Sequence, residues 1–287
     1  MLNFVKKKKL KKIEFPIDYF SKFENKNFRY YFEILERYNL KAVIALENFR
    51  VKYIKNLLTI SNDYDFEIIR IKMSNFFGGN RYKQKKFNIT KKNFIKDLRL
   101  VSKIIKKTHL KIAIENHQDL SSKELIEIIR KLNCKNIGIT WDIGNSLATC
   151  ETPDQFFENS KKFIFNVHCK NYKIILSKEG FFLKRSKIHE GSINIKRYIN
   201  FFKKNNLNLS LELAAHVNRH CDFNNEKFLQ YHVAKGKKLK NFTKYLIKNS
   251  KNESPFSNWE LFKNINLCAK KELIEFNHSL NELKMYV

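Results

Sequence analysis

The sequence is short of glycine, proline and acidic residues, and it has no organised cysteine pattern. Seven Gly and three Pro in 287 residues exclude collagen-like and proline-rich chains. They also predict few turns that need a positive φ. The five cysteines are odd in number, scattered and without a CxxC pair, which disfavours a disulfide framework or a zinc knuckle. We therefore expect a reducing, cytoplasmic location.

Long apolar runs are missing as well. No stretch approaches the roughly 18 apolar residues that cross a bilayer. The basic run at residues 6–9 lacks the apolar segment that follows it in a signal peptide. Hydrophobic residues nevertheless make up 43% of the chain and include 26 Phe, which predicts a large buried core. The 57 Lys plus Arg outnumber the 28 Asp plus Glu to give a net charge of +29, so a nucleic-acid partner has to be considered.

Short apolar runs alternate with segments of helical period. Strands are expected at 11–15, 41–47, 66–73, 111–115, 136–142, 163–168 and 207–214. Such alternation predicts parallel strands joined by helices. No glycine-rich phosphate turn follows the first strand, which disfavours an open doubly wound sheet. We therefore predict an α/β fold, a (β/α)8 TIM barrel over residues 1–225, followed by a helical, Lys-rich extension over 226–287.

Polar residues end each of the last four expected strands. Glu115 lies in IAIENH, Asp142 in ITWDIGN, His168 in FNVHCKN and Glu212 in LSLELAA. One such carboxylate is usually a solvated residue or a helix cap, but four in order are hard to assign to chance. A barrel would gather them at one mouth, where three carboxylates without a cation would repel one another. Oxygen donors suit Mn²⁺ or Mg²⁺, and the imidazole admits Zn²⁺ or Co²⁺, so one divalent ion is expected.

These motifs resemble a known family. IENH, WDIGN, VHCKNY and LELA are similar to the four metal-ligand blocks of the xylose isomerase-like TIM-barrel superfamily, in its sugar phosphate isomerase/epimerase branch. The segment EGSINIKRYI (190–199) resembles the block after the third ligand. The resemblance is strong over 111–222 and absent after 224. It implies that Glu115, Asp142, His168 and Glu212 bind one metal, and that Glu115 and Glu212 exchange a proton with the substrate.

The chemistry that the resemblance implies is proton transfer next to a carbonyl. A cation that polarises a carbonyl and its neighbouring hydroxyl stabilises the enediolate formed when the proton leaves. The expected activity is that of an isomerase or epimerase of a sugar, sugar phosphate or cyclic polyol in carbohydrate metabolism. Loss of a β-hydroxyl from the same intermediate would make the enzyme an inosose dehydratase-like lyase. A non-enzymatic descendant that keeps the metal for structure is a third alternative.

The residues expected to contact substrate depart from the family pattern. Asn145 stands where ketose epimerases commonly have His, and Ile174 where they have a substrate-contacting Arg. The substrate contacts of those epimerases therefore do not carry over. Trp141, just before a ligand, is expected to pack in the barrel. Polar residues near the four strand ends are the substrate-binding candidates, each with a surface role as the alternative: Asn116, His117, Asn145, Lys170, His189, Glu190, His216 and Arg219.

The same superfamily contains type IV apurinic endonucleases, and a strongly basic chain would suit DNA. Those enzymes need three metals and extra ligands, one of them a His at the position of Asn145. Most of the positive charge also lies outside the expected catalytic half, because residues 111–222 carry only +6 of the +29. A metal-dependent hydrolase on DNA is therefore disfavoured, and a small sugar or polyol is the expected partner, without a membrane. A homo-oligomer remains open.

The amino end poses a topological problem. If residues 11–20 correspond to the family's second strand, the first βα unit is missing or truncated. Seven strands would leave two unpaired edges, which proteins normally cover. The segment after 224, a partner subunit or a degenerate segment could cover this gap.

Overall fold

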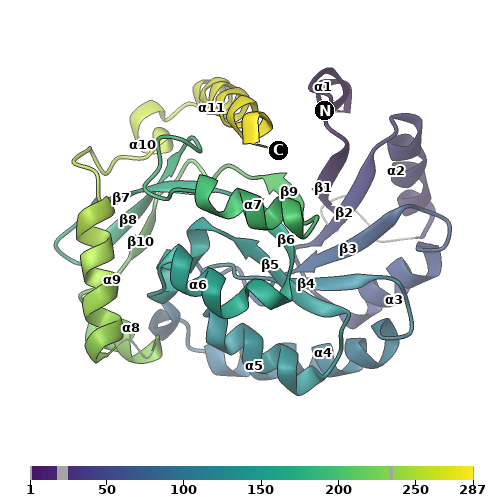
Figure 1. Ribbon diagram of the computed structural model, residues 1–287, viewed down its shortest axis with the longest axis horizontal. Coiled ribbons are helices and arrows are strands. Elements are labelled where there is room, and N and C mark those ends of the chain that lie inside the picture. The colour runs from purple at the N-terminus through teal and green to yellow at the C-terminus, as the bar shows by residue number, and fades with distance from the viewer. Residues whose placement is uncertain (1, 18–24, 233–234, 287) are drawn as a thin grey trace.

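Seven parallel strands form a nearly closed barrel at the centre of the molecule (Figure 1). The protein is represented by a computed structural model that describes residues 2–17, 25–232 and 235–286. Within these residues the strand order is β1-β2-β3-β4-β5-β6-β9. The strands are β1 (Lys12–Pro16), β2 (Lys41–Leu46), β3 (Phe66–Ile71), β4 (Lys111–Glu115), β5 (Ile137–Asp142), β6 (Ile164–Cys169) and β9 (Asn208–Leu211). The seven expected strands and the TIM-barrel fold are confirmed.

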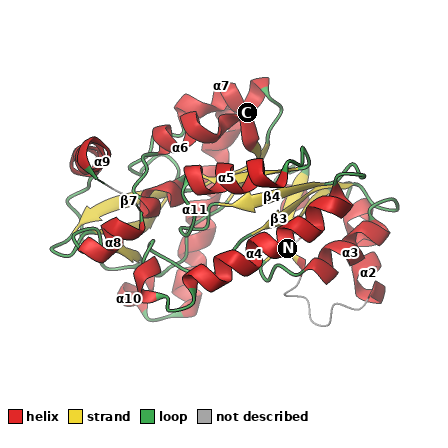
Figure 2. Ribbon diagram, turned by 90° about the horizontal axis from the view of Figure 1, so that it is seen from below, coloured by secondary structure: helices red, strands yellow, loops and turns green. Residues whose placement is uncertain are grey.

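Amphipathic helices cover the outside of the barrel (Figure 2). They are α2 (Asn25–Arg37), α3 (Val51–Ile60), α4 (Phe87–Ile105), α5 (Ser122–Leu132), α6 (Pro153–Ser160) and α7 (Lys196–Lys204), with short 3₁₀ helices η2 (Arg81–Lys83), η3 (Gly144–Thr149) and η4 (Lys161–Phe163). Ser121 caps α5 in a capping box with Glu124, and the Ser-x-x-Glu spacing is typical of a helix start. Trp141 is fully buried beneath α6 and α7, where its ring stacks on Phe156 and meets Tyr198 edge-on. It is a packing residue, as expected.

No backbone ladder joins β1 and β9 among the described residues, at the place where the first strand of a complete barrel would lie. Helices α1 (Leu2–Lys7) and α11 (Ile265–Tyr286) meet over this gap. The rings of Phe4 and Phe276 are 5.7 Å apart, and Nζ of Lys284 donates to the carbonyl of Lys8 at 2.5 Å. The sequence offers three candidates for what covers this gap. In the structure, the chain after residue 224 covers it, through α11.

A second, antiparallel sheet stands beside the barrel and was not expected from the sequence. It contains β7 (Asn171–Leu176), β8 (Phe181–Ser186) and β10 (Arg219–Cys221) in the order β10-β8-β7. The sequence predicts no strand between residues 168 and 207, where β7 and β8 lie. The remaining helices, α8 (Glu226–Tyr231), α9 (Gly236–Asn249) and α10 (Asn258–Phe262), follow it in the chain. Phe242 of α9 packs edge-on against Phe181 of β8, which fixes α9 to this sheet.

Turns with positive φ are more common than the low glycine content predicted. Among the described residues, seven non-glycine positions have positive φ. Three of them, Asn39, Asn133 and Asn206, come just after α2, α5 and α7. Asparagine tolerates the left-handed conformation better than most residues and replaces glycine at these helix ends. None of the described helices is both long and apolar enough to cross a bilayer.

Candidate metal centre

The four polar residues singled out from the sequence come from neighbouring strands. Glu115 ends β4, Asp142 ends β5, His168 lies near the end of β6, and Glu212 follows β9 directly. Asp142 and His168 are register partners across β5 and β6. Because adjacent parallel strands place their carboxyl ends at the same rim, the four residues converge on one mouth.

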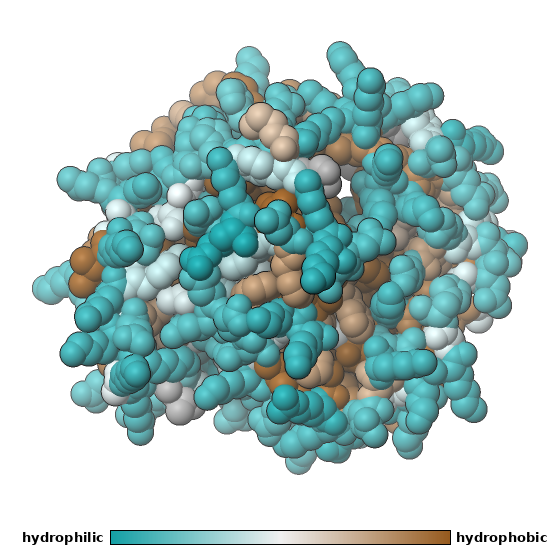
Figure 3. Space-filling model, in the orientation of Figure 1, coloured by the Kyte–Doolittle hydropathy of each residue, from teal (hydrophilic) through white to brown (hydrophobic). Residues whose placement is uncertain are grey.

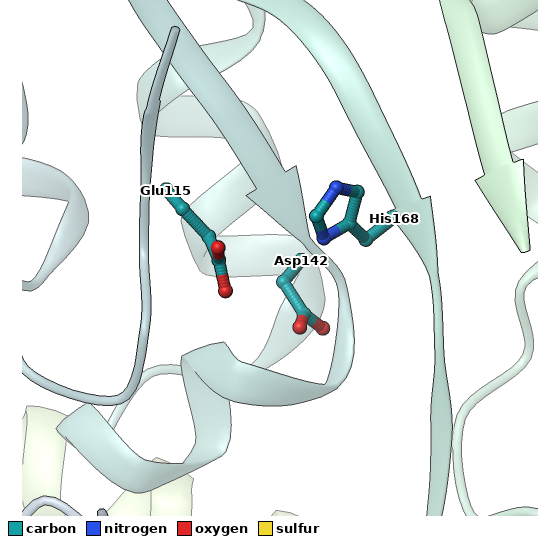
Figure 4. A group of neighbouring side chains, drawn as sticks. All are labelled: Glu115, Asp142 and His168. Carbon is teal, nitrogen blue, oxygen red and sulfur yellow. The ribbon is translucent and has the colours of Figure 1, made fainter. Parts of the chain in front are cut away.

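Three of these residues form a candidate metal-binding group (Figure 4). Glu115, Asp142 and His168 each offer one ligand atom, and these atoms lie within 4.8 Å of one another. All three residues are buried. Oδ1 of Asp142 is buried and has no hydrogen-bond partner among the described residues. A buried carboxylate oxygen without a donor is costly and is well suited to a cation, so this donor set fits a divalent metal.

Glu212 lies beside this group, but its oxygens contact other side chains. Oε2 is 2.6 Å from Nδ1 of His168, and Oε1 is 2.6 Å from Nζ of Lys170. Burial raises the pKa of Glu212, but Lys170 and His168 lower it more, so the net pKa is well below its usual range. Glu212 is thus an ionised carboxylate next to the three donors. Its role as a fourth metal ligand stays a prediction.

A second set of charges lies inside the barrel and is not among the residues predicted from the sequence. Arg70 of β3 contacts Glu14 of β1 at 3.0 Å, Glu47 after β2 at 2.6 Å and Glu115 at 3.2 Å. Its side chain is only 10% exposed. Lys72 also pairs with Glu47. The sequence does indicate these charges, because a charged residue interrupts or ends each of the apolar strands KIEF, KAVIALE and EIIRIKM.

These cations change the electrostatic argument for a metal. The sequence suggested that three carboxylates would repel one another unless a metal lay between them. In the structure, Arg70 neutralises part of the charge at Glu115, and Lys170 bridges Asp142, at 2.5 Å, and Glu212. Side chains therefore supply part of the positive charge, and the stronger evidence for a metal is the partnerless oxygen of Asp142.

Glu14 orients the imidazole of His168. Nε2 of His168 is 2.9 Å from Oε2 of Glu14. When this nitrogen carries the proton and donates to Glu14, Nδ1 is left as the free ligand nitrogen, an arrangement common for metal-binding histidines. Burial lowers the pKa of His168, but the carboxylates of Glu14 and Glu212 raise it more, well above its ordinary value. Metal binding would have to displace this extra proton.

Three of the predicted substrate-binding residues contact Asp142 directly. Asn116 accepts from the Asp142 backbone N–H at 2.7 Å and donates to its carbonyl at 3.0 Å. Nδ2 of Asn145 donates to Oδ2 of Asp142 at 2.7 Å, and Lys170 pairs with the same oxygen. Asn116 and Asn145 thus position the carboxylate. Their roles toward a substrate stay predictions.

The other five candidates lie in two places. His117 packs its ring 5.3 Å from Phe77, and the guanidinium of Arg219 lies 3.6 Å from the same ring. The remaining three are engaged elsewhere. His189 and His216 pair with α11, through Glu282 at 2.7 Å and Glu272 at 2.8 Å, and Glu190 pairs with Lys187 at 2.6 Å. The structure shows no contact of His189, Glu190 or His216 with the metal-binding group.

Comparison with known families agrees with this arrangement. Residues 45–227 match the family described as xylose isomerase-like TIM barrel. The chain belongs to this family. The match includes Glu115, Asp142, His168 and Glu212. No curated protein matches the sequence.

Solved structures of the xylose isomerase-like fold align with most of the chain. A xylose isomerase-like TIM-barrel protein from Mycobacterium smegmatis in complex with magnesium has 10% identity and a TM-score of 0.58, covering 87% of this chain and 88% of its own. A D-tagatose 3-epimerase-like protein has 19% identity and a TM-score of 0.54, with 83% and 90% covered. The probable 3-DHS dehydratase AsbF from Bacillus anthracis has 13% identity and a TM-score of 0.54, with 84% and 92% covered. At these identities the likeness shows the fold.

Proposed function

We propose that this chain is a divalent-metal-dependent isomerase or epimerase of a small sugar, sugar phosphate or cyclic polyol. The observation that carries the proposal is the buried group of Glu115, Asp142 and His168, with the partnerless Oδ1 of Asp142 inside it. Family membership supports it, because the same strand ends are the ones that the family resemblance implies as metal ligands. The proposal includes the cytoplasmic location suggested by the scattered, unpaired cysteines.

Glu115, Asp142 and His168 would hold the metal, with Glu212 as the fourth ligand. When bound, a divalent ion would polarise a substrate carbonyl and its neighbouring hydroxyl and so make the adjacent carbon more acidic. Glu212 is the proposed base. Its side chain is 40% exposed and therefore within reach of a molecule in the mouth, and Lys170 and His168 hold it ionised.

Glu115 is the proposed partner in proton transfer from the opposite side. Its carboxylate is nearly buried, and Arg70 holds it at 3.2 Å. Lys170, which contacts both Asp142 and Glu212, is the proposed donor to a substrate oxygen. Return of the proton to the other face of the same carbon gives epimerisation, and return to the neighbouring carbon gives isomerisation.

Metal analysis tests the site itself. Elemental analysis of the purified chain is expected to give about one divalent ion per chain, and His168→Ala is expected to lower the occupancy severalfold. Arg29→Ala, at an exposed pair with Asp63, serves as the control and leaves occupancy unchanged. A wild-type chain that binds no divalent ion at all contradicts the proposal, and about three ions per chain would favour the endonuclease alternative.

Isotope exchange tests the chemistry. Incubation with ketoses, sugar phosphates and inososes in deuterated water is expected to place deuterium on the carbon next to the carbonyl, and Glu212→Gln is expected to slow this exchange by about a hundredfold or more. Exchange accompanied by loss of water from the substrate would assign the dehydratase alternative. Absence of exchange across the whole panel, with metal bound, would overturn the proposed reaction.

A further inference from the structure

In the part of the chain that the structure describes, the gap in the barrel wall is bordered by two sheet edges without a neighbouring strand. Strand β1 pairs with β2, and β9 pairs with β6. No strand among the described residues pairs with the other edge of either one. Backbone N–H and C=O groups along such edges are available to an additional extended chain.

A pocket of about 470 Å³ lies along this gap, and we call it the lateral slot. Its walls come from both edge strands and from the two covering helices, and they include Val5, Ile13, Leu209, Leu211, Phe276 and Leu280. Figure 3 shows a hollow in this face between the end of α11 and the amino-terminal segment, with hydrophobic residues around it. An apolar slot between two open sheet edges offers both side-chain burial and backbone pairing.

We propose that the lateral slot binds an extended, acidic peptide of another protein, which pairs as a strand with β1 or β9. The open edges favour an extended chain over a helix or a compact ligand, because only an extended backbone can satisfy a row of strand donors and acceptors. Alternate apolar side chains of such a peptide would enter the slot, while the others would point away from it.

The charges around the slot select the type of peptide. Lys12 and Lys284 line it, and the ammonium of Lys8 lies 5.5 Å from the ring of Phe4, another lining residue. Glu14 is the acidic residue in the lining, and it is already engaged with Arg70 and His168. A second copy of this chain, at +29, would be repelled by this one, so the occupant is assigned to a different, acidic protein.

Synthetic peptides test the proposal without any use of activity. Short fluorescent peptides with alternating Val and Thr and with Asp at both ends are titrated into the full chain, and binding is followed by anisotropy. One matched peptide is N-methylated at alternate residues, and another carries Lys at both ends. N-methylation removes strand hydrogen bonds and is expected to weaken binding by about tenfold or more, and the Lys-ended peptide is expected to bind more weakly than the parent.

Two variants of α11 locate the binding. Phe276→Glu changes a residue of the slot and is expected to abolish peptide binding, whereas Ile274→Glu, at a side chain that is 52% exposed on the same helix, leaves binding unchanged. Peptide is also expected to slow hydrogen exchange of the β1 and β9 amides. The parent and N-methylated peptides are both measured with the wild-type chain, so this comparison does not depend on whether a variant folds.

Three results would overturn the proposal. Equal binding of the parent and N-methylated peptides would show apolar burial without strand pairing. Failure of the chain to retain any acidic, alternating sequence from a random peptide library would exclude the assigned occupant. Concentration-dependent self-association that protects the β1 and β9 amides would assign the slot to a second copy. None of these results depends on whether the metal centre is catalytic.

Discussion

His232 shows how strongly the fold can control one side chain. The residue is 4% exposed, and Nε2 lies 2.6 Å from the carbonyl oxygen of Gly79, to which it donates. Burial, together with the smaller effect of the positive charge of Arg81, lowers the pKa of His232 to about 3. The folded chain therefore keeps this imidazole neutral at pH values where the unfolded chain protonates it.

The sign of the resulting pH dependence follows from proton linkage. Below about pH 6.5 the unfolded state binds a proton at His232 that the folded state does not, so stability falls as the pH is lowered. We expect the free energy of unfolding of wild type to drop between about pH 7 and about pH 5 by about 2 kcal/mol more than that of His232→Gln. Urea unfolding at both pH values measures this difference. His278→Gln, at an exposed position, is the control, and an equal drop in all three proteins would contradict the prediction.

At the residue scale, the sequence identified the members of the site better than their partners. Glu115, Asp142 and His168 were recognisable because a polar residue at the end of an apolar strand is unusual. Glu14 and Arg70 carry the same signal, yet their contact joins residues 56 positions apart, and nothing local indicates which strands face each other. The pairing of Lys170 with Asp142 and Glu212 was equally hidden, because it depends on side-chain directions at the rim.

At the scale of elements, the loop after β3 depends on its glycines. Gly78 and Gly79 both have positive φ, at 64° and 66°. A Cβ on Gly79 would lie 1.8 Å from the carbonyl oxygen of Ala148, which belongs to η3 next to the metal-binding group. This loop therefore approaches the backbone of η3 too closely for any side chain.

Substitution at this position should be costly. Gly79→Ala is expected to lower the free energy of unfolding by about 3 kcal/mol or more, because strain in φ adds to a backbone clash. Gly236→Ala is the matched control. Gly236 also has positive φ, 51°, but open space around its Cα, so only about 1 to 2 kcal/mol is expected there. Chemical denaturation of the two variants checks this, and equal effects would argue against the close approach.

The regular βα units could be predicted because each strand and helix has its own hydrophobic period. The hairpin of β7 and β8 could not be placed in the same way. Its turn signal at Ser177–Gly180 is present, and Ser177 and Gly180 exchange backbone hydrogen bonds there. However, these antiparallel strands lie between β6 and α7 and break the βα alternation. Because the alternation predicts one strand for each helix, it does not predict β7 and β8.

At the scale of the whole molecule, α11 is attached to the rest of the chain by a buried ion pair. Nε of Arg185 in β8 lies 2.6 Å from Oε2 of Glu275, and Nη1 lies 3.1 Å from Oε2 of Glu272. The Arg185 side chain is 4% exposed and that of Glu275 is 7% exposed, whereas that of Glu272 is 51% exposed. The carboxyl-terminal extension is therefore part of the folded core in this region.

The two glutamates should contribute very differently. Glu275→Ala leaves the buried guanidinium of Arg185 without its closest carboxylate and is expected to cost about 3 to 5 kcal/mol of stability. Glu272→Ala removes an exposed partner of the same arginine and is expected to cost about 1 kcal/mol or less. Thermal and urea unfolding of the pair measure both values. Similar losses from the two variants would show that α11 is held by other contacts.

The missing backbone ladder between β1 and β9 leaves the circumference of this barrel adjustable. In a closed barrel, a ring of backbone hydrogen bonds fixes the diameter. Here, no ladder of backbone hydrogen bonds joins the described strands β1 and β9, and the strands are linked by a side-chain hydrogen bond from the hydroxyl of Ser210 to Oε2 of Glu14 at 3.1 Å. Glu14 stands on one side of this opening and Glu212 on the other, and His168 contacts both. A change in the width of the opening will therefore alter the distances from the imidazole of His168 to Glu14 and Glu212, so the geometry of this candidate metal ligand depends on the barrel wall.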